Sequence, residues 1–311
     1  MVSTVGFPGL ALRNYSQEEG TAKLHETFEQ GMNYYDVAPA YGKDGDCEIK
    51  MGIGMEGMDR DKIFLSCKTK RRDKAGAKEE LERSLKRLKT DRFDLYQVHC
   101  LFEPNEVEQA LDRENGAIAT ILEAQKAGVI KHIGFSAHTT RAAIAALQGF
   151  EFDTVMFPIN FVEQNTIGMG KQVVQLAQKQ GAGVIAIKII SKGAWQRDTK
   201  PQGAWWYQWP EEQEELNLFY RWTMSQKNLA AGIPCSFFPQ IDMCIKAAKS
   251  FKPITDDDVQ KLRTVSADCL SLFRAREQQV SMGRMPEEPF GSDNPHECFR
   301  HGHAHRHDHT G

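Results

Sequence analysis

The feature that most constrains this chain is a regular alternation between short apolar runs and longer amphipathic stretches. The apolar runs have the length of strands, and the stretches between them repeat their apolar residues every three or four positions, as helices do. Strands that alternate with helices in this way are typical of βαβ units, which build a parallel sheet. We expect strands over residues 2–12, 33–37, 62–68, 93–100, 131–136, 154–159, 183–190 and 231–235.

Helix signals lie between these strands. Ser16 and Glu19 have the spacing of a capping box, in which a serine hydroxyl and a glutamate carboxylate satisfy backbone amides at a helix start, and the helix stops at Gly31. Further helices are expected over residues 75–88, 117–127, 141–148, 171–180, 212–225 and 241–250. Eight strand-then-helix units fit a closed barrel, which usually takes about 250 residues. The predicted fold class is therefore α/β, a (β/α)8 TIM barrel.

The barrel does not account for all 311 residues. Residues 256–273 have helical period and are expected to form an extra C-terminal helix on the barrel, so we predict a barrel unit over residues 1–275. Residues 276–311 form a C-terminal extension that ends in a His-rich tail. Its His301, His303 and His305 are candidate metal ligands. An extended tail does not fix a tetrahedral site, so no metal is expected in the mechanism.

Composition argues against several classes of function. The formal net charge is -3, which gives no electrostatic reason to expect a nucleic-acid partner or an anionic membrane. No apolar run approaches the roughly 20 residues of a membrane helix, and no secretory signal is expected. The 7 cysteines are scattered and form no CxxC pair, which favours free thiols in a reducing compartment. We expect a cytoplasmic protein with a small-molecule partner, and the oligomeric state stays open.

Reactive side chains fall where barrel enzymes place their chemistry, at the carboxyl ends of the strands. Asp36 ends the second strand and Tyr41 lies in its loop. Lys68 ends the third strand and His99 the fourth. Neighbouring strands lie about 4.8 Å apart, so these ends converge. The sequence therefore predicts a carboxylate, a phenol, an ammonium and an imidazole at one place.

The motifs around these residues resemble the aldo-keto reductase superfamily. They include GMNYYDVAPAYG at residues 31–42, LSCKT at 65–69, DLYQVH at 94–99 and GVIKHIGFSAH at 128–138, followed by motifs at 183–188, 219–226 and 232–234. All occur in the family's order and at barrel spacing, over residues 2–273. The resemblance implies a nicotinamide-dependent oxidoreductase whose catalytic residues are Asp36, Tyr41, Lys68 and His99.

The chemistry of these side chains agrees with the resemblance. Reducing a carbonyl group needs a hydride, which nicotinamide supplies, and a proton from a general acid. A free tyrosine has a pKa of about 10, so a neighbouring cation such as Lys68 is needed to make Tyr41 a usable acid. Asp36 would hold Lys68 in place, and His99 would hydrogen-bond the carbonyl oxygen. We predict an NAD(P)H-dependent reductase of an aldehyde or ketone, or a dehydrogenase of the alcohol.

Nearby residues leave alternatives for two of these roles. Lys70 is the alternative to Lys68, because side-chain alternation puts both on one face of the strand. The family pattern favours Lys68. Tyr34 and Tyr35 are alternatives to Tyr41, but both lie inside the strand rather than in its loop.

The resemblance also implies cofactor contacts. Ser136 matches the serine that hydrogen-bonds the nicotinamide carboxamide, Asn160 matches an asparagine after the sixth strand, and Lys188 matches a lysine near the cofactor phosphates. Ala137 and Met156 stand where many members have Asn and Gln.

The loop after the eighth strand bears on the choice of coenzyme. Many members have an arginine there that holds the 2′-phosphate of NADPH, but residues 233–242 contain none. Ser236, Lys246 and Lys249 are the candidates that remain. The resemblance to the family favours NADPH as the cofactor, with NADH possible.

The loop at residues 195–209 is rich in tryptophan and either packs on the barrel top or lines a substrate pocket.

Two rival functions also stay open. The departures at Ala137 and Met156 would suit a nucleotide-binding, redox-sensing protein with little turnover. A barrel aldolase would use Lys68 as a Schiff base, but the tyrosine, aspartate and histidine around it argue against that.

Overall fold

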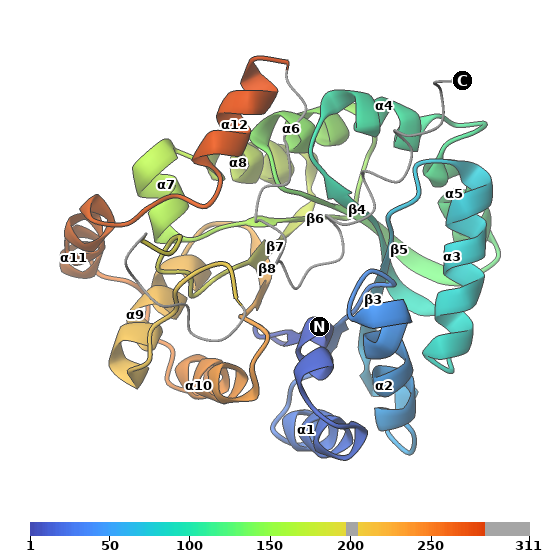
Figure 1. Cartoon of the computed structure of the whole chain (residues 1–311), viewed down its shortest axis with the longest axis horizontal. Coiled ribbons are helices and arrows are strands. Elements are labelled where there is room, and N and C mark those ends of the chain that lie inside the picture. Colours follow the sequence, from blue (N-terminus) through green and yellow to red (C-terminus); the bar gives the residue numbers. More distant parts are fainter. Residues whose placement is uncertain (197–204, 284–311) are drawn as a thin grey trace, which may run out of the picture.

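Eight parallel strands form one sheet in the order of the sequence, in a computed structural model that describes residues 1–196 and 205–283. A bridge between Val5 and Gly232 joins the first strand to the last, and the Gly6 amide donates to the Gly232 carbonyl at 3.0 Å. Figure 1 shows the helices arranged around this ring of strands. The predicted (β/α)8 TIM barrel is confirmed. The strands are β1 (Phe7–Pro8), β2 (Tyr34–Asp36), β3 (Phe64–Thr69), β4 (Phe93–Leu101), β5 (Ile130–Ala137), β6 (Thr154–Pro158), β7 (Gly183–Ile187) and β8 (Leu229–Ile233).

The helices predicted from periodicity are all present, with ends close to those expected. Ser16 and Glu19 form the capping box at the start of the first helix. These helices are α1 (Gln17–Glu29), α3 (Lys74–Arg87), α5 (Ala117–Lys126), α6 (Thr140–Gly149), α8 (Lys171–Gln180), α9 (Gln213–Met224) and α10 (Phe238–Lys249).

Within the barrel, three short helices were not predicted: α2 (Asp46–Gly54), α4 (Pro104–Leu111) and α7 (Phe161–Ile167). Two of them are too brief to show a helical period. The third, α2, contains Gly52 and Gly54, and glycine disfavours helices. Packing explains Gly52, because an added Cβ would lie 2.2 Å from the Arg87 carbonyl oxygen. Packing against the end of α3 therefore outweighs the low helix propensity of glycine.

The first strand is shorter than the apolar run that predicted it. Residues 2–12 were expected to be one strand, but β1 ends at Pro8 and a 3-10 helix follows over Gly9–Asn14. Proline has no amide hydrogen for the sheet, and Gly9 passes so close to β2 that an added Cβ would lie 2.6 Å from the Asp36 carbonyl oxygen. The chain turns there, and its apolar residues are buried in the helix rather than in the sheet.

Two apolar cores lie on the two sides of the strands. Alternate side chains fill the inside of the barrel, and the other set packs against the helices in a larger cluster. Because the barrel interior is filled, the reactive side chains gather above it at the carboxyl ends of the strands. The interior cluster consists of Tyr34, Leu95, Met156, Ile185, Ala231 and Ile233.

The C-terminal part of the described chain forms two helices rather than one. The expected helix over residues 256–273 ends early as α11 (Asp256–Ala267), and α12 (Arg274–Ser281) follows. The predicted boundary at 275 falls inside α12, which lies beside α6 in Figure 1. The Glu163 carboxylate anchors the connecting segment by accepting hydrogen bonds from the Ser271 hydroxyl and, at 2.8 Å, from the Leu272 amide.

Burial makes this anchor sensitive to pH. It raises the pKa of Glu163 to about 6, from an ordinary value of 4.5. Between these two values the folded chain binds more protons at this carboxyl than the unfolded chain does. The contribution of Glu163 to the unfolding free energy therefore falls as the pH rises through this window, by about 2 kcal/mol in total.

We expect Glu163→Gln to lose this pH dependence. Urea unfolding of the two proteins on both sides of the window measures the difference, with the exposed Glu108→Gln on α4 as the control. The wild-type unfolding free energy should fall more than that of Glu163→Gln as the pH is raised. Equal slopes in the two proteins would show that Glu163 is not the group that titrates.

Candidate active site

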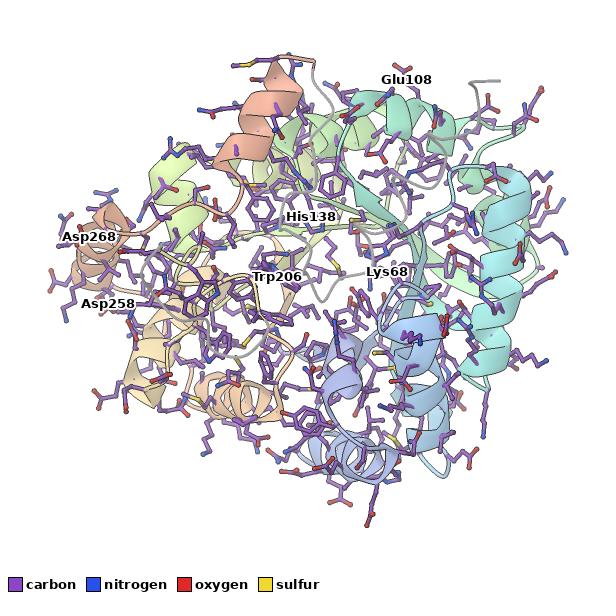
Figure 2. The ribbon with its side chains drawn as sticks, viewed as in Figure 1. Lys68, Glu108, His138, Trp206, Asp258 and Asp268 are labelled. Carbon is purple, nitrogen blue, oxygen red and sulfur yellow. The ribbon has the colours of Figure 1, made fainter. Side chains whose placement is uncertain are left out.

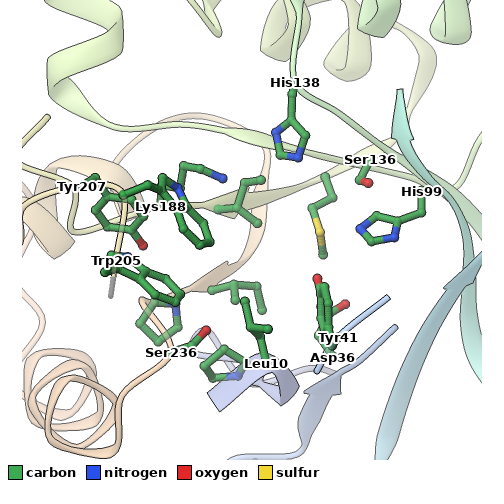
Figure 3. A pocket seen from close by; sticks show the side chains of 16 residues that line it. Leu10, Asp36, Tyr41, His99, Ser136, His138, Lys188, Trp205, Tyr207 and Ser236 are labelled. Atoms are coloured by element: carbon green, nitrogen blue, oxygen red, sulfur yellow. The ribbon is translucent and has the colours of Figure 1, made fainter. Parts of the chain in front are cut away.

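A cavity lies at the carboxyl ends of the strands, with about 540 Å³ of empty space when the open solvent at its mouth is included. Strand ends and their loops supply most of its wall, and the loop at 205–207 closes one side (Figure 3). Its lining consists of Pro8, Leu10, Asp36, Tyr41, His99, Ser136, His138, Met156, Ile187, Lys188, Trp205, Trp206, Tyr207, Ile233, Pro234 and Ser236.

Lys68 is fully buried beside this cavity, near the centre of the molecule in Figure 2. Its ammonium donates to the Asp36 carboxylate, with Nζ and Oδ2 2.5 Å apart, and to the Val37 carbonyl at 3.0 Å. It also lies 3.4 Å from the Tyr41 hydroxyl oxygen. A buried lysine stays charged only if it is paired and hydrogen-bonded, and Asp36 meets that need. The arrangement places a positive charge directly against the phenol.

Tyr41 and His99 lie edge to face at the cavity. Their ring centroids are 5.8 Å apart and their planes are inclined by 80°. Both residues line the cavity, and both are more than nine-tenths buried. The loop after β2 carries the phenol and the end of β4 carries the imidazole. The barrel thus brings together the four side chains that the sequence predicted from three separate strand ends.

The alternatives to these residues lie in other places. Tyr34 points into the barrel core, where its hydroxyl lies 3.4 Å from Asp36 Oδ1. Tyr35 faces the helices and donates to the Leu24 carbonyl. Lys70 follows the end of β3 and does not line the cavity. Lys68 and Tyr41 are therefore the lysine and tyrosine that meet at this site.

Three of the four predicted cofactor residues line the cavity, namely Ser136, Lys188 and Ser236. Asn160 does not. It caps α7, where its side-chain oxygen accepts a hydrogen bond from the Glu163 amide at 3.0 Å. Its amide nitrogen Nδ2 is buried and has no hydrogen-bond partner among the described residues. The observed position of Asn160 is that of a helix cap beside the site rather than of a cavity wall.

Lys188 adopts an unusual backbone conformation at the end of β7. Its φ is +59°, in the left-handed region that glycine prefers. The ammonium lies 5.7 Å from the centre of the Trp206 ring and 5.6 Å from that of Phe273. The Lys188 ammonium thus lies at the cavity wall close to two aromatic rings.

The lysines considered for the 2′-phosphate lie far from the cavity. Lys246 and Lys249 are in the last turn of α10, whereas Ser236 precedes its first turn. At a rise of 1.5 Å per residue, the two lysines lie roughly 12–17 Å along the helix from its start. The Lys249 ammonium instead donates to the Gln30 side chain at 3.3 Å. Ser236 is the one of the three candidates that reaches the cavity.

Sequence reasoning missed His138 as a cavity residue. Figure 3 shows its imidazole pointing toward the cavity from the end of β5. The ring stacks on Phe273 with centroids 6.0 Å apart, and burial lowers the pKa of His138, which keeps it neutral at pH 7. Strand alternation was the available signal, because residues 136 and 138 share a face.

The tryptophan-rich loop both packs and lines the cavity. Trp205, Trp206 and Tyr207 contribute to the wall. Trp195 and Trp209 contact each other edge to face, with ring centroids 6.4 Å apart. Residues 197–204 of this loop lie outside the described chain. The sequence left two roles open for this loop. Lining the cavity applies to Trp205, Trp206 and Tyr207, and packing applies to Trp195 and Trp209.

The aldolase alternative is disfavoured by this geometry. A Schiff-base lysine attacks a carbonyl carbon as a neutral, accessible amine. Lys68 has no solvent exposure and is ion-paired with Asp36. It is placed to act on Tyr41 rather than on a substrate.

The family model of the aldo/keto reductases matches residues 4–237, which is most of the chain. The chain belongs to the Aldo/keto reductase family. It is 30% identical over 126 residues to methylglyoxal reductase DkgA of Salmonella typhimurium, a match that covers 40% of this chain and 43% of that protein. The matched region thus spans less than half the length of this curated relative.

Solved aldo-keto reductases share the fold. The holo form of AKR11C1 from Bacillus halodurans superimposes with a TM-score of 0.68 at 22% identity, covering 85% of this chain and 92% of that one. An aldo-keto reductase from Klebsiella pneumoniae, solved in complex with NADPH, gives a TM-score of 0.65 at 18% identity, with 85% and 91% covered. At these identities the likeness concerns the fold.

The described residues hold neither a candidate membrane-spanning helix nor a candidate metal cluster. Across residues 1–196 and 205–283, no helix combines the length and apolar character needed to cross a membrane. The same residues contain no cluster of three or more His, Cys, Asp or Glu side chains placed to hold a metal ion. The tail candidates His301, His303 and His305 lie outside the described chain.

Proposed function

We propose that this protein reduces a small aldehyde or ketone with NADPH, and that Tyr41 is the general acid. The observation that carries the proposal is the Asp36–Lys68–Tyr41 chain, a buried ion pair whose ammonium contacts a phenol on the wall of a cavity. Membership of the aldo/keto reductase family supports the same reaction class.

Each residue of the chain has a separate task. Tyr41 donates its hydroxyl proton to the carbonyl oxygen of the substrate, which becomes an alcohol oxygen. The phenolate that remains is stabilised by the Lys68 ammonium 3.4 Å away. Asp36 keeps that ammonium charged and in place, since an unpaired cation would be costly to bury. The reverse sequence makes Tyr41 the base for alcohol oxidation.

His99 would orient the substrate. Its imidazole lies edge to face with Tyr41, so a carbonyl oxygen that accepts from the phenol also comes within reach of the imidazole. A hydrogen bond from His99 would stabilise the negative charge that develops on this oxygen. The aromatic wall at Trp205, Trp206 and Tyr207 suits a small, largely apolar substrate.

The side chains around the cavity fit a nicotinamide dinucleotide. Bound NADPH supplies the hydride that reduces the carbonyl carbon. The Ser136 hydroxyl would donate to the carboxamide, and the Lys188 ammonium would pair with a phosphate. Ile187, Ile233 and Pro234 add apolar surface to the same cavity. Asn160 would act through its cap on α7 rather than by contact.

A carbonyl panel tests the proposed function. The protein is mixed with NADPH and methylglyoxal, a short aldehyde, an aromatic aldehyde or a ketone, and oxidation of NADPH is followed by absorbance. Turnover with at least one carbonyl compound is expected. NADPH binding without any turnover would contradict the reductase and favour a redox-sensing protein. Absence of NADPH and NADH binding would contradict both.

We expect NADPH to bind only modestly more tightly than NADH. In the loop after β8 and in α10, the hydrogen-bonding side chain that lines the cavity is the neutral Ser236. A neutral hydrogen bond contributes about 0.5–1.5 kcal/mol, which corresponds to roughly two- to tenfold in affinity. Fluorescence titration with both coenzymes at one ionic strength measures this ratio. A preference beyond about a thousandfold would mean that a charged group elsewhere grips the 2′-phosphate.

A further inference from the structure

The residue after His99 has a strained backbone. Cys100 has φ +65°, in the left-handed region that is costly for a residue with a Cβ. The pairing of β4 with β5 shifts at this point, between Val98 and Leu101, so His99 and Cys100 form a bulge in the strand. Bulges re-aim side chains beside active sites. Here His99 belongs to the bulge and lines the cavity that it shares with Tyr41.

Two side chains hold both polar groups of Cys100. The Cys100 amide donates to the Ser136 hydroxyl oxygen at 2.7 Å, in a fully buried contact between β4 and β5. The Cys100 carbonyl accepts from the Arg72 guanidinium at 3.2 Å. Arg72 in turn pairs with Glu106 on α4. Regular pairing resumes immediately afterwards, because the His138 amide donates to the Leu101 carbonyl at 2.9 Å.

We infer that Ser136 is a positioning residue for His99, in addition to its proposed contact with the cofactor. Without the serine oxygen, the Cys100 amide would be buried without its acceptor, and, of the two side chains that hold residue 100, Arg72 would remain. The backbone would relax toward an extended form, and His99 would turn away from Tyr41.

The two roles of Ser136 are compatible because a hydroxyl has one proton and two lone pairs. The Cys100 amide uses a lone pair, which leaves the proton for the nicotinamide carboxamide. This second part rests on the proposed function. The Ser136 hydroxyl would then link cofactor binding to the orientation of the His99 imidazole. Binding of the coenzyme would thereby fix the orientation of the group that hydrogen-bonds the substrate carbonyl.

A rescue experiment separates the two roles. Ser136→Ala removes the acceptor, and Cys100→Gly removes the Cβ that makes the left-handed conformation costly. Cys100→Ala is the matched control, since it also removes the sulfur but keeps the Cβ. Single-turnover reduction is measured at saturating NADPH, and NADPH affinity is measured separately by fluorescence titration.

We expect Ser136→Ala to lower the single-turnover rate by roughly tenfold, as for the loss of about 1.4 kcal/mol. Ser136→Ala/Cys100→Gly should recover most of that rate relative to Cys100→Gly alone, whereas Ser136→Ala/Cys100→Ala should not. NADPH affinity should stay weakened in both double variants, because the carboxamide contact is not restored. Equal rates in the two double variants, or a loss confined to NADPH affinity, would overturn the positioning role.

A second readout does not depend on catalysis. The imidazole NMR signals of His99 in the coenzyme-free protein, assigned with His99→Gln, should move in Ser136→Ala and return toward their original positions when Cys100→Gly is added. Unmoved signals in Ser136→Ala would overturn the inference. If the carbonyl panel gives no turnover, this measurement still tests the positioning of His99, so the two proposals fail separately.

Discussion

Replacing Tyr41 by phenylalanine is expected to lower kcat by about a hundred- to ten-thousandfold, the usual cost of losing a general acid. NADPH binding should be nearly unchanged. The substitution removes only the hydroxyl, and the ring keeps its contacts with the Lys68 ammonium, 4.9 Å from the ring centre, and with His99. Steady-state kinetics on the best carbonyl substrate and a fluorescence titration with NADPH measure the two quantities.

Tyr34→Phe is the matched control for this experiment. The Tyr34 hydroxyl also lies close to Asp36, at 3.4 Å, but the ring fills the barrel core and does not line the cavity. A small effect on kcat is expected there. If Tyr41→Phe retained most of the wild-type turnover at neutral pH, Tyr41 would not be the acid.

Lys68→Met is expected to have the other large effect, on both rate and stability. Without the ammonium, the phenolate left by proton transfer loses its stabilising charge, so the rate falls. The pH above which reduction declines should rise toward the value of about 10 for a free tyrosine. The variant also leaves the Asp36 carboxylate buried without its partner, which costs about 3–5 kcal/mol of unfolding free energy.

Adding Asp36→Asn to Lys68→Met separates these effects. The double variant no longer buries an unpaired charge, so its unfolding free energy should recover while its rate stays low. Lys70→Met is the control for a lysine outside the cavity and should leave the pH–rate profile in place. An unmoved profile in a folded Lys68→Met protein would rule out the proposed role of Lys68.

Much of this barrel was predictable because its signals are local. The strand runs and helical periods gave the order of the eight units, since each depends on residues close together in the chain. The catalytic candidates followed from the same order, because parallel strands bring their carboxyl ends to one face. Asp36, Tyr41, Lys68 and His99 could be named before any contact between them was known.

Other features depend on contacts between distant segments. β1 ends at Pro8, where Gly9 passes close to the backbone of β2. α2 forms despite its glycines because Gly52 packs against the backbone at the end of α3. The left-handed Cys100 depends on Ser136, from β5, and on Arg72, from the loop after β3, which hold its amide and its carbonyl. Periodicity carries no information about such partners.

In the active site, too, some features follow from the local sequence and others from contacts between distant segments. The sequence determined which reactive groups the strand ends present, because side-chain type and strand order are properties of the chain itself. Only the tertiary structure decided that Lys68 is buried against Asp36 and that Asn160 caps a helix outside the cavity wall. It also brought His138 to the wall and left Lys246 far from it. These outcomes depend on burial and on distances between separate loops, which are fixed only when the barrel closes.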